Sequence, residues 1–239
     1  MKKISISILI SLMCMFQISN AQDVNKQEKN KGKETKVEIF RDRLMVDVFH
    51  TFWLNSPTTI NTKQFNPGFN VALMWDFKQA NKGPMSFGLG LGVTYHTQFT
   101  DALLQMDDAS KIMKYFVLPE KTDYFKYKLN RISYVSCNIP LELRYRHSSG
   151  FKFTVGVRLG LIAELSQRYK GDDYKESGNQ QNYKTFEIHN KQKFNFDVYA
   201  RCGWKFVSVF YSYQVNKVFE NGKGPLVSPM SLGLTITLF

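Results

Sequence analysis

The chain has 239 residues, a formal net charge of +12 and a mean hydropathy of −0.31. This low hydropathy excludes a membrane protein built from helices, because each spanning helix needs about 20 mostly apolar residues. The positive charge does not indicate a nucleic-acid partner, since no nucleic-acid-binding motif accompanies it.

The N-terminus predicts a secretory signal peptide over residues 1–21. Two lysines precede an apolar run at 4–18, and residues 19–21 fit a small-x-small cleavage site. We expect this segment to be removed on export. A lipoprotein anchor at Cys14 is the alternative, but the residues before it do not match the usual lipobox.

Residues 22–41 are polar and charged, with few apolar side chains. Such a composition cannot bury enough surface to order itself, so we expect a disordered periplasmic leader. A docking role for this leader is the alternative. The remainder, 42–239, has the size of one domain.

From residue 43 onward, apolar and polar residues alternate in eight segments, with the period of two that is typical of β-strands. All are longer than the five or six residues usual in globular proteins, and all reach the 9–11 that a tilted strand needs to cross a bilayer. The expected strands are 43–54, 67–77, 85–99, 131–146, 151–164, 191–201, 205–215 and 230–239.

The alternation is clearest in 85–99, where one face is apolar and the other carries Gly88, Gly90 and Gly92. Three glycines on one face suit a narrow barrel, because its interior has little room for side chains. We therefore predict an all-β fold, an eight-stranded antiparallel up-and-down transmembrane β-barrel. Its apolar faces point outward to lipid and its polar faces point inward to a lumen.

The connections between the expected strands alternate between long and short. The longest, 100–128 and 167–190, are polar, and we expect irregular loops there; the shortest are 147–150 and 202–204. Outer-membrane barrels have short periplasmic turns and long extracellular loops, so both long segments are expected outside the cell. A soluble lipocalin-like binding protein is the alternative, but its apolar side would face inward.

The segment Tyr134–Arg146, YVSCNIPLELRYR, followed by a short turn and Phe151–Gly160, resembles the PorT-like outer-membrane β-barrel family of Gram-negative bacteria. The resemblance implies a barrel in the cell outer membrane without a common enzymatic activity, and some relatives serve secretion machinery. Phe239 also resembles the aromatic terminus that barrel-insertion machinery uses, although the apolar residues of 232–238 hold the opposite parity.

Charged residues of both signs fall on the expected inward faces. They must pair in a narrow lumen, because single desolvated charges are costly. We expect Arg144 to face Lys152, and Arg158 to pair with Asp197 at mid-lumen. A gated ion path is the alternative to this structural network. The expected lumen charge network is Glu142, Arg144, Lys152, Arg158, Glu164, Asp197 and Arg201, with Asp47, Asp76 and Lys193 on the same faces.

We expect no enzyme, no cofactor and no metal site. An outer-membrane lipid hydrolase would use His96 with Glu164 near one rim, but no G-x-S-x-G motif is present. The four histidines show no metal-ligand spacing. Cys137 and Cys202 are interpreted as small lipid-facing residues.

Two functions remain open. Aromatic residues mixed with charges in 100–128 and 167–190 favour a protein or glycan partner at the extracellular loops, whereas a mainly structural membrane role needs no such partner. A small-solute channel or a secretion-machinery component is the further alternative. Outer-membrane lipids and the barrel-insertion machinery are the other expected partners.

Overall fold

The structure, a computed structural model, describes residues 43–62, 65–78, 84–122, 125–173, 179–186 and 188–238. The chain divides into two units, Met1–Glu38 and Ile39–Phe239, and only the second contains described residues. The expected signal peptide and leader, together with Phe239, lie outside the described residues.

The described chain is built from β-strands joined by turns and loops. No α-helix occurs among the described residues, so none there is long and apolar enough to cross a membrane. The strands are β1 Leu44–Leu54, β2 Pro67–Lys78, β3 Met85–Phe99, β4 Ala102–Met106, β5 Met113–Val117, β6 Tyr127–Arg146, β7 Phe151–Asp172, β8 Gln180–Thr185, β9 Phe194–Trp204, β10 Val207–Gln214 and β11 Ser228–Leu238.

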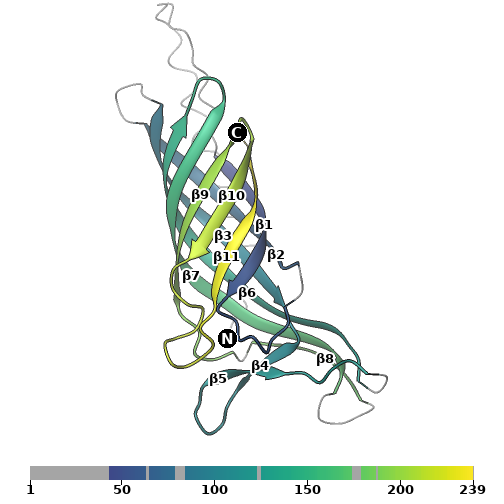
Figure 1. Cartoon of the computed structure of the whole chain (residues 1–239). Helices are drawn as coiled ribbons and strands as arrows, with labels where there is room; N and C mark the ends of the chain where they lie inside the picture. The colour runs from purple at the N-terminus through teal and green to yellow at the C-terminus, as the bar shows by residue number, and fades with distance from the viewer. Residues whose placement is uncertain are drawn as a thin grey trace, which may run out of the picture. The chain divides into compact units, whose positions relative to one another are not determined.

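Eight of these strands form a closed antiparallel barrel (Figure 1). The order around the barrel is β6, β3, β2, β1, β11, β10, β9 and β7, and the pairing of β6 with β7 closes the ring. β7 pairs with β9 up to Leu161 and with β8 from Gln167 onward. β4 and β5 form a separate two-stranded sheet. The expected eight-stranded antiparallel barrel is confirmed.

The two ends of the barrel differ in their connections. At one end, here the short-turn end, β2, β6 and β9 end and β3, β7 and β10 begin, with six, four and two residues between them. At the other, the long-loop end, lie the connections 55–66, 100–126, 173–193 and 215–227. β4, β5 and β8 all lie at the long-loop end, away from the β6–β7 turn (Figure 1).

Three expectations about the connections were wrong. Cys202–Trp204 end β9, and the turn is formed by 205–206, with Lys205 in the left-handed region at φ 49°. The segment 100–128 contains the β4–β5 hairpin and the start of β6. The segment 167–190 contains the end of β7 and all of β8. β4, β5 and β8 are short and lack the long apolar–polar alternation of the barrel strands, so a search for that alternation passes over them.

The interior glycines have the expected packing reason. A Cβ on Gly88 would lie 3.0 Å from Nε of Arg144, and one on Gly156 would lie 2.7 Å from Cζ of Tyr199. Long polar side chains therefore fill the space that the glycines leave inside the barrel. This space is where the barrel gathers its charges.

Candidate functional site in the lumen and at the long-loop end

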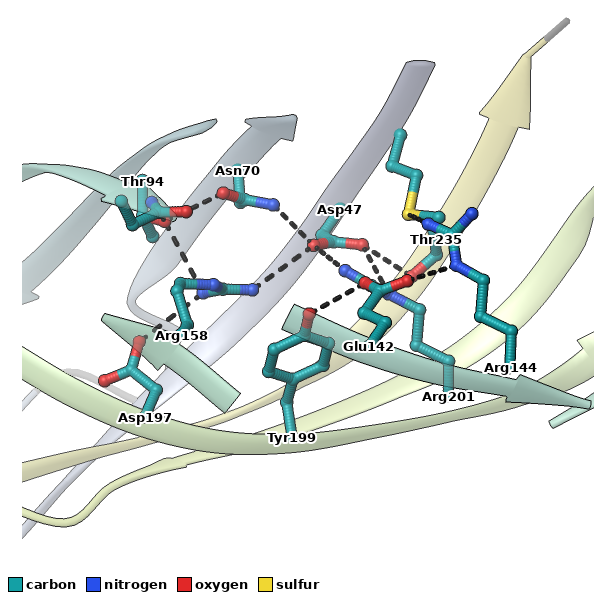
Figure 2. A network of polar contacts seen from close by, with 12 residues as sticks. Asp47, Asn70, Thr94, Glu142, Arg144, Arg158, Asp197, Tyr199, Arg201 and Thr235 are labelled. Atoms are coloured by element: carbon teal, nitrogen blue, oxygen red, sulfur yellow. Dashed lines mark hydrogen bonds and ion pairs between the residues drawn. The ribbon is translucent and has the colours of Figure 1, made fainter. Parts of the chain in front are cut away.

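Arg201 joins two carboxylates at the centre of the lumen (Figure 2). From β9 it donates from Nη2 to Oδ2 of Asp47 on β1 at 2.9 Å, and from Nη1 to Oε1 of Glu142 on β6 at 2.5 Å. Thr235 and Asn70 also donate to Asp47, at 2.6 and 2.7 Å. Both carboxylates are buried, so each depends on these donors for its solvation.

Two further guanidinium groups extend the cluster toward the short-turn end. Arg144 donates from Nε to Glu142 and from Nη1 to Asp76, both at 2.5 Å. Arg146 donates from Nη2 to the other oxygen of Asp76 at 2.8 Å. Charge-assisted hydrogen bonds of this length are the stronger class of hydrogen bond, and they tie β6 to β2 across the interior.

Arg158 completes the cluster on the side of the long-loop end. It lies directly opposite Asp197 on β9, with Nη1 at 3.5 Å from Oδ2, and its Nη2 is 3.7 Å from Asp47. The side chain is only 1% exposed. Four cations thus meet four anions, so the formal charges of this group cancel; we call it the lumen cluster: Asp47, Asp76, Glu142, Asp197, Arg144, Arg146, Arg158 and Arg201.

Aromatic rings fill the space beside the lumen cluster. Phe49, Tyr199 and Phe210 pack together, with Phe210 5.6 Å from Phe49 and 6.3 Å from Tyr199 between ring centroids. The guanidinium carbons of Arg158 and Arg201 lie 4.9 and 4.8 Å from the Tyr199 ring, in cation–π range. Tyr199 also donates its hydroxyl to Glu142 at 2.7 Å.

The expected facing of Arg144 and Lys152 was wrong. The turn closes with the His147 N–H donating to the Phe151 carbonyl, and the register then places Lys152 opposite Arg146. Arg144 instead lies opposite Thr154. Lys152 is buried, and its Nζ donates to Thr237 at 2.7 Å.

Glu164 does not point into the lumen, because β7 carries a bulge just before it. Val135 pairs with Glu164 whereas Ser136 pairs with Ile162, so Ala163 is the extra residue and the inward parity of β7 reverses. Glu164 therefore lies on the outer face, 41% exposed, and accepts a hydrogen bond from Lys184 at 2.8 Å. Lys193, also expected inward, is exposed and precedes β9.

The bulge also separates the two groups proposed for a hydrolase. His96 is buried inside the barrel, where its ring stacks on Tyr134 at 4.5 Å between centroids and its Nδ1 is 3.2 Å from the Thr51 hydroxyl. Glu164 is on the outer face of the barrel wall. The pair that a hydrolase would need is therefore not assembled.

An apolar cluster fills much of the long-loop half of the barrel, beside buried polar side chains such as Gln98, Asn130 and Gln167. The β4–β5 hairpin contributes to this cluster and is held there by a hydrogen bond from the Leu104 N–H to Gln167 at 2.9 Å. Burial at this position raises the pKa of the Tyr115 hydroxyl on β5 well above its ordinary value. The cluster, here the mouth cluster, consists of Trp53, Leu104, Met113, Ile132, Tyr134, Ile162, Leu165, Ile188, Val218, Phe219 and Val227.

On the outer face of the barrel, the apolar residues lie toward the short-turn end, where the interior is charged. Between the short-turn end and the bulge, large apolar side chains on all eight barrel strands are exposed. We call these residues the apolar belt: Val48, Phe52, Phe69, Val71, Trp75, Phe77, Met85, Phe87, Leu89, Leu91, Ile139, Leu141, Phe151, Phe153, Val155, Leu159, Leu161, Phe194, Val198, Trp204, Val207, Val209, Tyr211, Leu232, Leu234, Ile236 and Leu238. Cys137 and Cys202 share this face as free, exposed thiols.

A shallow depression of about 290 Å³ lies at the long-loop end. Nζ of Lys121 is 4.3 Å from the centroid of the Tyr127 ring. The depression is lined by Lys121, Tyr127, Lys128, Asn61, Thr62, Thr100, Asp101 and Asn130. Within the described ranges, no group of three or more His, Cys, Asp or Glu side chains is arranged to hold a metal ion.

Neither a protein-family model nor a curated protein matches the chain. Two similar solved structures are of Ail, the attachment invasion locus protein of Yersinia pestis, one of them in complex with the heparin analogue sucrose octasulfate. Each is 10% identical to this chain and covers 82% of it and 97% of its own length, with TM-scores of 0.39 and 0.37. At these values the likeness carries no argument about function. The resemblance to the PorT-like family stays a prediction.

Proposed function

We propose that the chain is an integral outer-membrane β-barrel whose lumen is closed to solutes. The apolar belt carries this proposal, because it covers the outside of all eight barrel strands below the bulge, where the interior is polar and the charges of the lumen cluster cancel. Apolar surface of this extent is unfavourable in water and favourable against lipid chains. A lipocalin-like protein would need the reverse arrangement, with its apolar side chains inside.

The outer membrane is the membrane proposed, for two reasons that come from the sequence. The expected signal peptide directs the chain to export, and closed barrels are the β-structures that span membranes. The start of β1 and the end of β11 then lie on the periplasmic side of the membrane. The long-loop end of the barrel lies outside the cell.

Two layers close the lumen. The lumen cluster and its three aromatic rings fill the part inside the apolar belt, and the mouth cluster fills the part toward the long-loop end. Arg144, Arg158 and Phe210 are at most 1% exposed, which supports a lumen closed to hydrated ions. These contacts favour a structural role for the charges over a gated ion path.

Gel mobility and bilayer conductance test this proposal together. Protein extracted from outer membranes in mild detergent is run with and without boiling, and the unboiled sample is added to planar bilayers. We expect a shift in mobility on boiling and no single-channel steps. A soluble periplasmic protein without a shift would contradict the barrel, and discrete conductance steps would contradict the closed lumen.

We propose a second role, the binding of a protein or glycan at the long-loop end. The β4–β5 hairpin exposes Met106, Phe116 and Val117, and its base, where Ala102 pairs with Val117, follows Asp101 in the depression that contains Lys121 and Lys128. Exposed aromatic and apolar side chains next to lysines suit a surface partner, since such residues are the usual anchors of interfaces.

Deleting 100–128 would remove part of the mouth cluster, so substitutions at the surface are the sharper test. Lys121→Ala with Lys128→Ala, displayed on cells, is compared with wild type for retention on immobilised glycans and matrix proteins. We expect at least one ligand to retain the wild-type barrel and the double variant to lose most of that retention. Asp108→Asn, on the exposed loop of the same hairpin, is the matched control. Equal retention of wild type and double variant would contradict this role.

A further inference from the structure

Three cations stand in one row across neighbouring strands on the outer face of the barrel. Arg131 on β6 is the register partner of Arg168 on β7, and Arg168 is the partner of Lys184 on β8. We call these three residues the cationic row. Figure 1 shows β6, β7 and β8 side by side at the long-loop end.

The fold gives no reason for this arrangement. Like charges directly opposite each other on paired strands are destabilising, and adjacent strands are only about 4.8 Å apart. Lys184 has a partner in Glu164, but among the described residues neither Arg131 nor Arg168 forms an ion pair with a carboxylate. The Nε of Arg131 is buried and makes no hydrogen bond within the described part of the chain. An anion from outside the chain would balance these charges.

The position of the cationic row identifies the source of that anion. The row shares the outer face with the apolar belt, and Val135 on β6 is the last apolar residue below it. From Val135 to Arg131 is about 13 Å along the strand, or about 10 Å along the membrane normal at the tilt usual for barrel strands. Headgroups occupy the first 5–7 Å or so beyond the hydrocarbon, and long basic side chains bend toward them.

We propose that the cationic row binds the phosphate groups of an anionic glycolipid in the outer leaflet, whose acyl chains lie on the apolar belt below. This inference rests on the proposed insertion in the outer membrane. Lys170, exposed on β7 one row farther out, adds a fourth positive charge on the same face. Lys184 lies 4.4 Å from the ring of Phe186, which offers an apolar surface beside the phosphates.

The test measures binding of bisphosphorylated lipid A, in phosphatidylcholine vesicles, to the full folded chain. The variant Arg131→Gln with Arg168→Gln removes two charges of the cationic row. The control Lys111→Gln with Lys223→Gln removes two exposed charges from loops at the same end of the barrel. Each basic residue near an anionic surface is worth about a fivefold change in affinity, so the row variant should bind about thirtyfold more weakly.

Three comparisons decide the result. We expect wild type and control to bind equally, and dephosphorylated lipid A to bind wild type as weakly as the row variant binds the phosphorylated form. Equal binding by row variant and wild type would overturn the proposal. So would full competition by millimolar inorganic phosphate, because the site would then take a free anion.

The gel shift on boiling separates this inference from the proposal beneath it. A wild-type protein that shows the shift but does not discriminate phosphorylated lipid A contradicts the cationic row alone. If the double variant does not fold, Arg168→Gln alone decides, because its side chain is exposed and makes no ion pair in the described structure. It should then bind about fivefold more weakly than wild type.

Discussion

Along β6 and β7, the two halves of the barrel place polar and apolar side chains on opposite faces. Below the bulge at Ala163, charged residues such as Glu142 and Arg158 point inward and leucines point outward; above it, Ile132 and Leu165 point inward and Arg131 points outward. The lower half has the polarity of a protein in lipid, and the upper half that of a protein in water. On the proposed membrane insertion, the same two strands pass from lipid to water, and the bulge lies at the boundary.

The largest effect is expected from the lumen cluster. Arg201→Ala would leave Asp47 and Glu142 buried without their shared cation, and should reduce the free energy of unfolding by about 3–5 kcal/mol. Urea unfolding in phosphatidylcholine vesicles measures it. Arg168→Ala, which removes the same charge from the outer face, should change stability by less than about 0.5 kcal/mol. Equal losses would contradict the assignment of inside and outside.

A second effect separates the mouth cluster from the apolar belt. Leu165→Ala removes a buried side chain from a water-excluded core and should cost about 2–5 kcal/mol. Leu159→Ala, on the same strand but 48% exposed, should cost clearly less because, on the proposed insertion, lipid chains fill the vacated space. Unfolding of both variants in the same vesicles compares them. A larger loss of stability for Leu159→Ala than for Leu165→Ala would contradict the assignment of the buried apolar core to the long-loop half.

Adding a charge outside the barrel sharpens the comparison. Leu234 lies midway along β11 and is 54% exposed, so Leu234→Arg would place a cation against hydrocarbon and cost about 2–4 kcal/mol. Asn182→Arg, equally superficial but on β8 above the boundary, should be nearly neutral. The folded fraction recovered on insertion into vesicles is the readout. If both variants insert equally, the apolar belt does not face lipid.

The smallest effect concerns the residue that the bulge moves. Glu164 and Lys184 form an ion pair with both side chains more than 40% exposed, and such pairs contribute about 0–1 kcal/mol. Glu164→Gln should therefore change the free energy of unfolding by no more than that amount. A loss of several kcal/mol would contradict the outward position of Glu164, because only a buried carboxylate depends so strongly on its partner.

The sequence was most informative along the apolar belt, where one face of each strand is apolar. Period-two alternation gives the correct face for β3 and for the hairpin of β6 and β7 up to Leu161, because lipid requires every outward position to be apolar. Equal depth on neighbouring strands likewise places Arg158 opposite Asp197.

The sequence was least informative beyond the boundary. One extra residue at Ala163 reverses the parity of β7, and nothing in the local composition marks it. Leu104 and Met113 belong to a core that forms only when the β4–β5 hairpin packs on the barrel. Their apolar character therefore gives no local strand pattern, and we expected a loop there. Phe49 and Phe210 were missed because apolar residues of a membrane barrel are expected to face outward. Each lies two residues from an inward polar residue, Asp47 or Ser208, and this spacing could have shown that they face inward.

The two free cysteines allow a direct measurement of the boundary. A spin label at Cys137, in a Cys202→Ser chain in vesicles, is compared with a label at Arg168→Cys in a chain without the native cysteines. Relaxation by oxygen reports exposure to lipid, and relaxation by a water-soluble nickel complex reports exposure to water. We predict that oxygen dominates at 137 and nickel at 168. Strong relaxation by nickel at both positions would contradict the account, because the apolar belt would then lie in water.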